Sequence, residues 1–147
     1  MQINLTKKEY KILLEVLTIA DWVLHAHKDE EDAGSRKYRA LEQKIYSLAA
    51  KTGAKNLVEY NEEYNMFFAT SELEENSDVV YFIEEFENDT FWEELIDRLA
   101  LRDQIAEEGE DAFAFLSPKE RFRRKQPLLE KYQDEFAENG LDNLRLI

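Results

Sequence analysis

Cysteine is absent from this 147-residue chain, and glycine and proline are scarce, at 4 and 2 residues. Without cysteine there is no disulfide framework, no thiolate nucleophile and no cysteine-ligated zinc site. All-β folds use glycine and proline freely in their turns, so the scarcity of both residues favours long helices. The composition therefore predicts an all-α fold.

The sequence also lacks a long uninterrupted apolar stretch. Charged residues such as Glu15 and Asp21 break the apolar runs every few positions, so none reaches the roughly 18 residues that a membrane span needs. Residues 1–8 have no basic stretch followed by an apolar block, as a secretory signal would. We therefore expect a cytoplasmic protein that does not enter a membrane.

Positive charge is also scarce: the chain has 19 lysine and arginine residues and 33 acidic residues, which gives a net charge of −14. Such a field repels phosphate backbones and anionic lipid, which argues against binding to nucleic acid or to a membrane surface. It would suit a basic protein partner or divalent cations. Alternatively, the charge only keeps the protein soluble.

What is present is a strong helical pattern, beginning with a capping box at Thr6 and Glu9. The helix that this box opens is predicted to run over residues 6–27. Its apolar residues fill an arc of roughly 220° at 100° per residue. An arc of that width predicts a central helix packed on several neighbours, with the acidic residues 29–32 ending it.

Further helices are predicted along the rest of the chain. Ser35 opens a second helix that ends at Gly53, and its apolar stripe consists of Tyr38, Leu41, Ile45 and Leu48. Aromatic residues at helical spacing predict a third helix over 57–68, and a short one begins near residue 78. Capping boxes open the last two helices, which begin after Thr90 and Ser117, and the final helix continues through Pro127 to Gly140.

Residues 2–5 and 143–146 alternate polar and apolar side chains and could pair as a two-stranded ribbon. There is no internal repeat, low-complexity tract or linker. The predicted fold is therefore a single helical domain over residues 1–147, a bundle of five to six helices around a buried N-terminal helix, with this short ribbon formed by the termini.

The two histidines are the first candidates for chemistry. His25 lies one helical turn after Asp21, so Asp21 could hold it by an i, i+4 hydrogen bond, and His27 falls within the apolar arc of the same helix. A metal or proton-transfer site could use these residues with carboxylates of the following loop. The alternative is that one histidine stabilises the helix end while the other is buried in the core. The sequence favours this alternative, because a metal site needs three or four ligands and the chain has only two histidines.

Two spaced carboxylate pairs are the second candidate. Glu72 and Glu75, followed by Glu94 and Asp97, resemble the ExxE…ExxD magnesium signature of the all-α nucleotide pyrophosphatases of the MazG and dimeric dUTPase kind. That resemblance implies a Mg²⁺- or Mn²⁺-dependent hydrolase of nucleotides or phosphoesters. Such a site needs both pairs on packed helices that face one cleft, whereas Glu72 and Glu75 fall in a predicted connector.

Other anomalies point to buried polar contacts or to binding. Arg102 and Asp103 face the apolar arc of their helix, so we expect any buried polar cluster to include Arg98, Arg102 or Asp103. Alternatively, their side chains reach the rim of the core.

The basic residues of 119–125 point in different directions around their helix, as expected if they neutralise the chain's own acidic helices. Trp22 stands on the polar arc, where exposed tryptophan is typical of interfaces, unless another helix of the chain covers it.

No set of residues converges on a catalytic mechanism, and no glycine-rich phosphate loop is present. We therefore expect a non-catalytic cytoplasmic protein without a cofactor. It would act by protein–protein interaction, as a homo-oligomer or by binding a basic partner. The alternative is the metal-dependent hydrolase.

Overall fold

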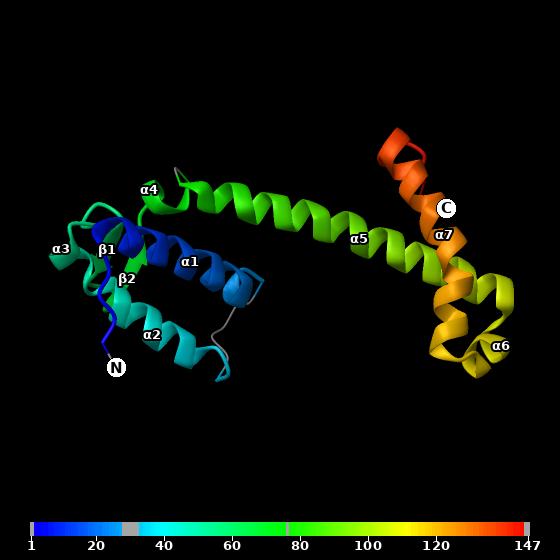
Figure 1. Cartoon of the computed structure of the whole chain (residues 1–147), viewed down its shortest axis with the longest axis horizontal. Coiled ribbons are helices and arrows are strands. Elements are labelled where there is room, and N and C mark those ends of the chain that lie inside the picture. The colour runs from blue at the N-terminus through cyan, green and yellow to red at the C-terminus, as the bar shows by residue number, and fades with distance from the viewer. Residues whose placement is uncertain (1, 28–32, 76, 146–147) are drawn as a thin grey trace. The chain divides into compact units, whose positions relative to one another are not determined.

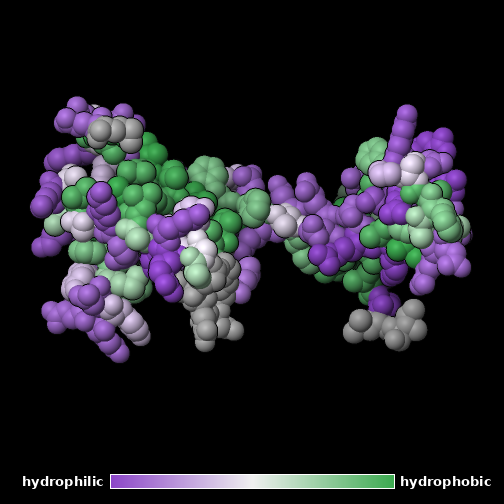
Figure 2. All heavy atoms as spheres, turned by 90° about the horizontal axis from the view of Figure 1, so that it is seen from below, coloured by the Kyte–Doolittle hydropathy of each residue, from purple (hydrophilic) through white to green (hydrophobic). Residues whose placement is uncertain are grey.

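A computed structural model describes residues 2–27, 33–75 and 77–145. The chain is mostly helical, as predicted, with one small antiparallel sheet (Figure 1). It divides into two compact units, residues 1–86 (unit 1) and 87–147 (unit 2), and each is described by itself. Contiguous hydrophobic areas lie on the surface of both units in the view of Figure 2.

Unit 1 is built on helix α1, Lys7–His25, which begins at the predicted capping box. The Thr6 hydroxyl accepts a hydrogen bond from the Glu9 backbone N–H at 3.2 Å, and the Glu9 carboxylate accepts one from the Thr6 N–H at 2.8 Å. Helix α1 contacts α2 and α4 and buries Tyr10, Leu14 and Thr18. These neighbours cover one side of its wide apolar arc, and the other side is exposed. Residues 29–32, predicted to end this helix, lie outside the described residues.

The predicted second helix is two helices, α2 (Arg36–Tyr46) and α3 (Ala49–Thr52). Gly53 ends α3 with a φ of 81°, as its predicted place after a helix C-terminus requires. The predicted apolar stripe of α2 is wrong at three of its four residues, and the fourth, Ile45, packs against the core. Tyr38, Leu41 and Leu48 are exposed, whereas Glu42 and Tyr46, about one position further around the helix, are buried.

The predicted helix over 57–68 is instead a β-hairpin of β1 (Val58–Asn61) and β2 (Met66–Ala69), in which Val58 pairs with Ala69. The Asn61 side chain accepts hydrogen bonds from the N–H groups of Glu63 and Tyr64 at 2.9 and 3.2 Å. Asn65 takes a left-handed φ of 53°, a conformation that asparagine tolerates better than most residues. Turn chemistry and the strand preference of the aromatic residues therefore override the helical spacing.

The predicted ribbon from the termini is also wrong. Residues 2–6 and 141–145 contain no strand. An alternating pattern of four residues specifies a strand only weakly, because an isolated two-stranded pair is marginal in water.

The core of unit 1 joins α1, α2, α3, the hairpin and α4, Ser71–Glu74. Leu14 and Leu73 are fully buried at its centre. The side-chain amide of Gln43 anchors the hairpin to α2, because it both donates to and accepts from the backbone of Phe67 at 2.7 Å. The buried members of the core cluster are Tyr10, Leu14, Tyr46, Ala49, Ala54, Leu57, Val58 and Leu73.

Unit 2 contains most of α5 (Asp78–Glu108), together with α6 (Glu110–Phe115) and α7 (Pro118–Asn139). The helix start predicted at Thr90 is wrong, because Thr90 lies inside α5. The capping box at Ser117 is confirmed, with the Glu120 carboxylate accepting from the Ser117 N–H at 3.0 Å. Helix α7 continues through Pro127, as predicted.

Candidate interaction surfaces

Helix α1 carries an exposed apolar line opposite its core face. Ile12 and Val16 are about half exposed, Val23 is 66% exposed, and Ile19 between them is partly buried. The spacing of 4, 3 and 4 residues places these four side chains within about 60° of each other on the helix. We call this set the α1 stripe (Ile12, Val16, Ile19, Val23).

Helix α2 carries a second exposed apolar line in the same unit. Tyr38 and Leu41 are about half exposed, and Leu48, just beyond the end of α2, is somewhat less so. We call these three residues the α2 stripe; Ile45, on the same side of the helix, packs against the core. Together the two stripes place six mostly exposed large apolar side chains, besides the partly buried Ile19, on a unit whose core holds eight buried residues.

Trp22, the residue predicted to bind a partner, is 45% exposed on α1. At 100° per residue it lies about 90° around the helix from the middle of the α1 stripe. It therefore adds a partly exposed aromatic ring beside the stripe rather than within it.

Asp21 and His25 are in contact at the C-terminal end of α1. Asp21 Oδ1 lies 2.7 Å from His25 Nδ1, as the i, i+4 spacing predicted, and 3.2 Å from a guanidinium nitrogen of Arg39 on α2. The other ring nitrogen of His25 is buried without a hydrogen-bond partner. His27 is exposed in the turn after α1, so its predicted place in the apolar arc is wrong. The contact of Arg39 with Asp21 ties α2 to α1.

A small cavity of about 40 Å³ lies beside this contact, lined by Asp21, Glu42, Glu74 and Tyr46 among others. Glu42 is only 6% exposed as a residue, and burial, followed by the charge of Asp21, raises the pKa of its carboxyl from 4.5 to about 7. Burial also raises the pKa of Glu74 and that of the Tyr46 hydroxyl, which lies 3.2 Å from the Thr18 hydroxyl. Three acids thus line a space with room for about one to three water molecules.

Sequence reasoning missed Glu42 and Tyr46. The only available signal was their spacing with Ala49, i, i+4 and i+7, which parallels the spacing of the α2 stripe. The neighbouring α1, β2 and α4, which close over Glu42, decide which of the two lines is buried.

Arg102 and Asp103 form a cluster with Tyr132 in unit 2. Two nitrogens of Arg102 donate to Asp103 Oδ1 at 2.9 and 2.7 Å, and the Tyr132 hydroxyl donates to Asp103 Oδ2. The Tyr132 hydrogen bond is the main cause that lowers the pKa of Asp103. The Arg102 side chain is mostly exposed, so the cluster lies at the rim of the core and links α5 to α7. Arg98 stands apart from it, exposed and paired with Glu94.

Two of the five basic residues of 119–125, Arg124 and Lys125, meet acidic residues of unit 2, in line with the neutralising role that the sequence favours, whereas Arg121 donates to the backbone carbonyls of Ala114 and Leu116. Arg124 binds the Glu108 carboxylate with both contacts within 2.7 Å, and Lys125 Nζ lies 2.6 Å from Asp97. These ion pairs hold α7 against α5.

The carboxylate pairs of the hydrolase alternative are engaged elsewhere. Glu94 and Asp97 pair with the cations of unit 2, and Glu72, in α4, accepts a hydrogen bond from Asn56 at 2.6 Å. Within the described ranges, no group of three or more histidine, aspartate or glutamate side chains is placed to hold a metal ion. The hydrolase alternative therefore stays a prediction without a site in these residues.

The comparisons with known proteins give no match, either to a family profile, to a curated protein or to a solved structure. Across residues 2–27, 33–75 and 77–145, no helix combines the length and the apolar character required to cross a bilayer.

Proposed function

We propose that this chain is a cytoplasmic, non-catalytic protein that acts by binding a basic protein partner through unit 1. One observation carries the proposal: α2 buries the carboxylate of Glu42 while it leaves the apolar side chains of Tyr38 and Leu41 in solvent. Burying a carboxyl group costs free energy, and an apolar side chain left exposed does not contribute the stabilisation that its burial would give. We infer from this combination that the apolar line of α2 serves for contact with another molecule.

The two stripes are suited to such a contact. Each large apolar side chain that a partner covers contributes about 1.5–3 kcal/mol if it becomes fully buried. The surrounding surface belongs to a chain with a net charge of −14, which attracts a basic partner over a distance of about one Debye length. Apolar contact would supply affinity, and the negative net charge of the whole chain would supply a faster association rate with a basic partner.

Site-specific photo-cross-linking in the cells that produce the protein tests this function. A photoreactive amino acid replaces Val16 or Leu41, and Lys55 and Glu59, which are exposed outside the stripes, serve as matched control positions. We expect discrete cross-linked species from Val16 and Leu41 that contain one basic protein and that the control positions do not give. Equal and diffuse cross-linking from all four positions would contradict the proposal.

A further inference from the structure

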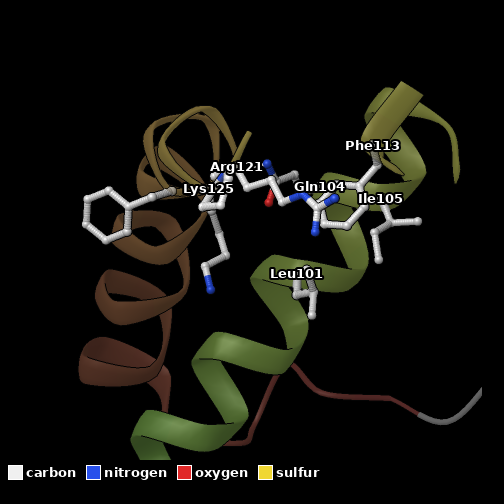
Figure 3. A pocket seen from close by; sticks show the side chains of 8 residues that line it. Leu101, Gln104, Ile105, Phe113, Arg121 and Lys125 are labelled. Atoms are coloured by element: carbon white, nitrogen blue, oxygen red, sulfur yellow. Dashed lines mark hydrogen bonds between the residues drawn. The ribbon is translucent and has the colours of Figure 1, made fainter. Parts of the chain in front are cut away.

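Unit 2 contains a pocket that the proposed function does not use. It has a volume of about 420 Å³ and opens between α5, α6 and α7. Figure 3 shows Leu101 and Ile105 on α5, Phe113 on α6, and Arg121 and Lys125 on α7 around this space. Pockets that bind small molecules measure about 300–1,000 Å³ and combine apolar walls with a few polar groups that orient the ligand. The size and the walls of this pocket are therefore those of a small-molecule site.

The charge at the pocket is positive, although the chain as a whole is strongly acidic. Among the described residues that line the pocket, Arg121 and Lys125 are charged and none is acidic. The ammonium group of Lys125 lies 2.6 Å from the carboxylate of Asp97, which neutralises it. The guanidinium of Arg121 instead donates to the backbone carbonyls of Ala114 and Leu116 at 3.0 and 3.1 Å. The uncompensated charge at this pocket is therefore that of Arg121.

Arg121 differs in this respect from the arginines that form ion pairs in unit 2. Arg98, Arg102 and Arg124 are exposed, and each pairs with a carboxylate. Arg121 is half-buried, so water screens its charge less than theirs. A guanidinium has five N–H groups, and three of those in Arg121 have no acceptor among the residues that the structure describes. The least exposed of these four arginines is thus the one without an anion.

The position of Arg121 on the pocket wall is fixed by contacts with α5 and α6. Its guanidinium lies over the Phe113 ring, 4.5 Å from the ring centre, besides its hydrogen bonds to the end of α6. The buried side-chain amide of Gln104, which reaches from α5 toward α7 in Figure 3, donates to the Arg121 backbone carbonyl at 3.0 Å. A cation that is already oriented loses little conformational entropy when it binds a ligand.

We propose that this pocket binds a small aromatic monocarboxylate, with its ring system against the apolar walls and its carboxylate on the Arg121 guanidinium. A planar guanidinium suits a carboxylate, because the two can form parallel hydrogen bonds. An apolar cavity of about 150 Å³ is enough to hold a benzene ring, so this pocket has room for a body of one or two rings. The Phe113 ring in its wall favours an aromatic body through edge and face contacts.

This inference goes beyond the proposed function and does not rest on it. The pocket lies in unit 2, whereas the two stripes lie in unit 1. The two proposals can therefore fail separately, because ligand binding at the pocket requires no cross-linked partner at Val16 or Leu41.

The net charge of −14 makes the charge of the ligand a discriminating variable. The field of the whole chain repels anions and attracts cations. Non-specific adsorption to exposed apolar surface would therefore favour a cationic aromatic molecule over an anionic one of the same shape. A preference for the carboxylate requires a local cation such as Arg121.

Nuclear magnetic resonance of the isotope-labelled full chain, titrated with three naphthalene derivatives, tests the proposal. The probes are 2-naphthoate, 2-naphthylmethanol and 2-naphthylmethylamine, which carry a negative, a neutral and a positive group on the same ring system. We expect saturable binding of 2-naphthoate, with shifts at the amides of residues 101–105, 113 and 121–125, and about tenfold weaker binding of the other two. Failure of 2-naphthoate to bind at millimolar concentration, equal affinity for all three probes, or shifts centred on unit 1 overturns the proposal.

Arg121→Met separates anchoring of the ligand from support of the pocket. Arg124→Met is the matched control, because Arg124 lies on the same helix, pairs with Glu108 and does not line the pocket. We expect Arg121→Met to weaken 2-naphthoate binding about tenfold and to change the affinity for 2-naphthylmethanol less than about threefold, with both affinities unchanged in Arg124→Met. Equal weakening of both probes in Arg121→Met overturns the role of Arg121 as the anion anchor. If Arg121→Met does not fold, as circular dichroism would show, the three probes on the wild-type chain decide alone.

Discussion

Glu42 shows how a single buried group sets a pH dependence. Its carboxyl has a raised pKa of about 7 in the folded chain, against 4.5 as the ordinary value, because it is buried beside Asp21. The folded state therefore favours the protonated carboxyl. The stabilisation that this proton provides is complete below pH 4.5 and is lost as the pH rises to about 7.

Glu42→Gln should remove this dependence, because the glutamine amide resembles the protonated carboxyl and carries no charge. We expect the variant to be more stable than the wild-type chain by about 2–3 kcal/mol at pH 8, with the difference vanishing near pH 4. Urea unfolding across this pH range measures it. A variant that gains nothing at pH 8 would show that Glu42 is solvated or paired in the folded chain.

At the scale of elements, local signals predicted some structures and failed at others for identifiable reasons. The boxes at Thr6 and Ser117 cap helices, because at both positions the chain enters the helix from an extended conformation. The same pattern at Thr90 lies within α5, where backbone hydrogen bonding inside the helix already satisfies the groups that a cap would serve. A capping motif thus predicts a helix start only where the preceding residues are not helical.

The hairpin and the exposure of the α2 stripe could not be predicted, because distant residues decide both. The aromatic residues of 57–68 fit helical spacing as well as a hairpin, and contacts with Gln43 on α2 stabilise the hairpin. In α2 the lines through Leu41 and Glu42 have the same spacing, and the packing of α1, β2 and α4 selects the one that is buried.

The turn of the hairpin gives a prediction at this scale. Asn65 has a positive φ of 53°, and its side-chain oxygen accepts a hydrogen bond from the Tyr60 hydroxyl. Asn65→Ala should lower the free energy of unfolding by about 1–2 kcal/mol, because alanine is strained at a left-handed φ and its side chain cannot accept this hydrogen bond. Asn65→Gly should recover the backbone part of the loss. Thermal unfolding of the two variants checks the order, and equal losses would contradict the backbone explanation.

At the scale of the whole molecule, the net charge of −14 dominates the response to ions. Repulsion among acidic side chains destabilises the compact state, and salt screens that repulsion. We expect the unfolding midpoint to rise with NaCl between 0.01 and 0.1 M. A midpoint that falls over this range would mean that the ion pairs of unit 2, such as Arg124 with Glu108, outweigh the net repulsion.

The same experiment with divalent cations tests the hydrolase alternative. Screening alone predicts that Mg²⁺ or Mn²⁺ raises the midpoint no more than NaCl at matched ionic strength. A bound metal ion would add stabilisation that grows with the ratio of its concentration to its dissociation constant. We expect no such excess at millimolar metal, because the described carboxylates do not gather into a ligand set. An excess for Mn²⁺ or Mg²⁺ would restore the hydrolase alternative.

The central claim is that the stripes of unit 1 are free for a partner, and the stability of the monomer tests it most directly. The double variant Val16→Ser, Leu41→Ser is unfolded in urea beside the wild-type chain and beside Leu14→Ala. Leu14 is fully buried on α1, the helix that also carries Val16. We predict a change within about 0.5 kcal/mol for the stripe variant and a loss of about 2–5 kcal/mol for Leu14→Ala. A loss of similar size in both would show that the stripes are part of the core, and would contradict the claim.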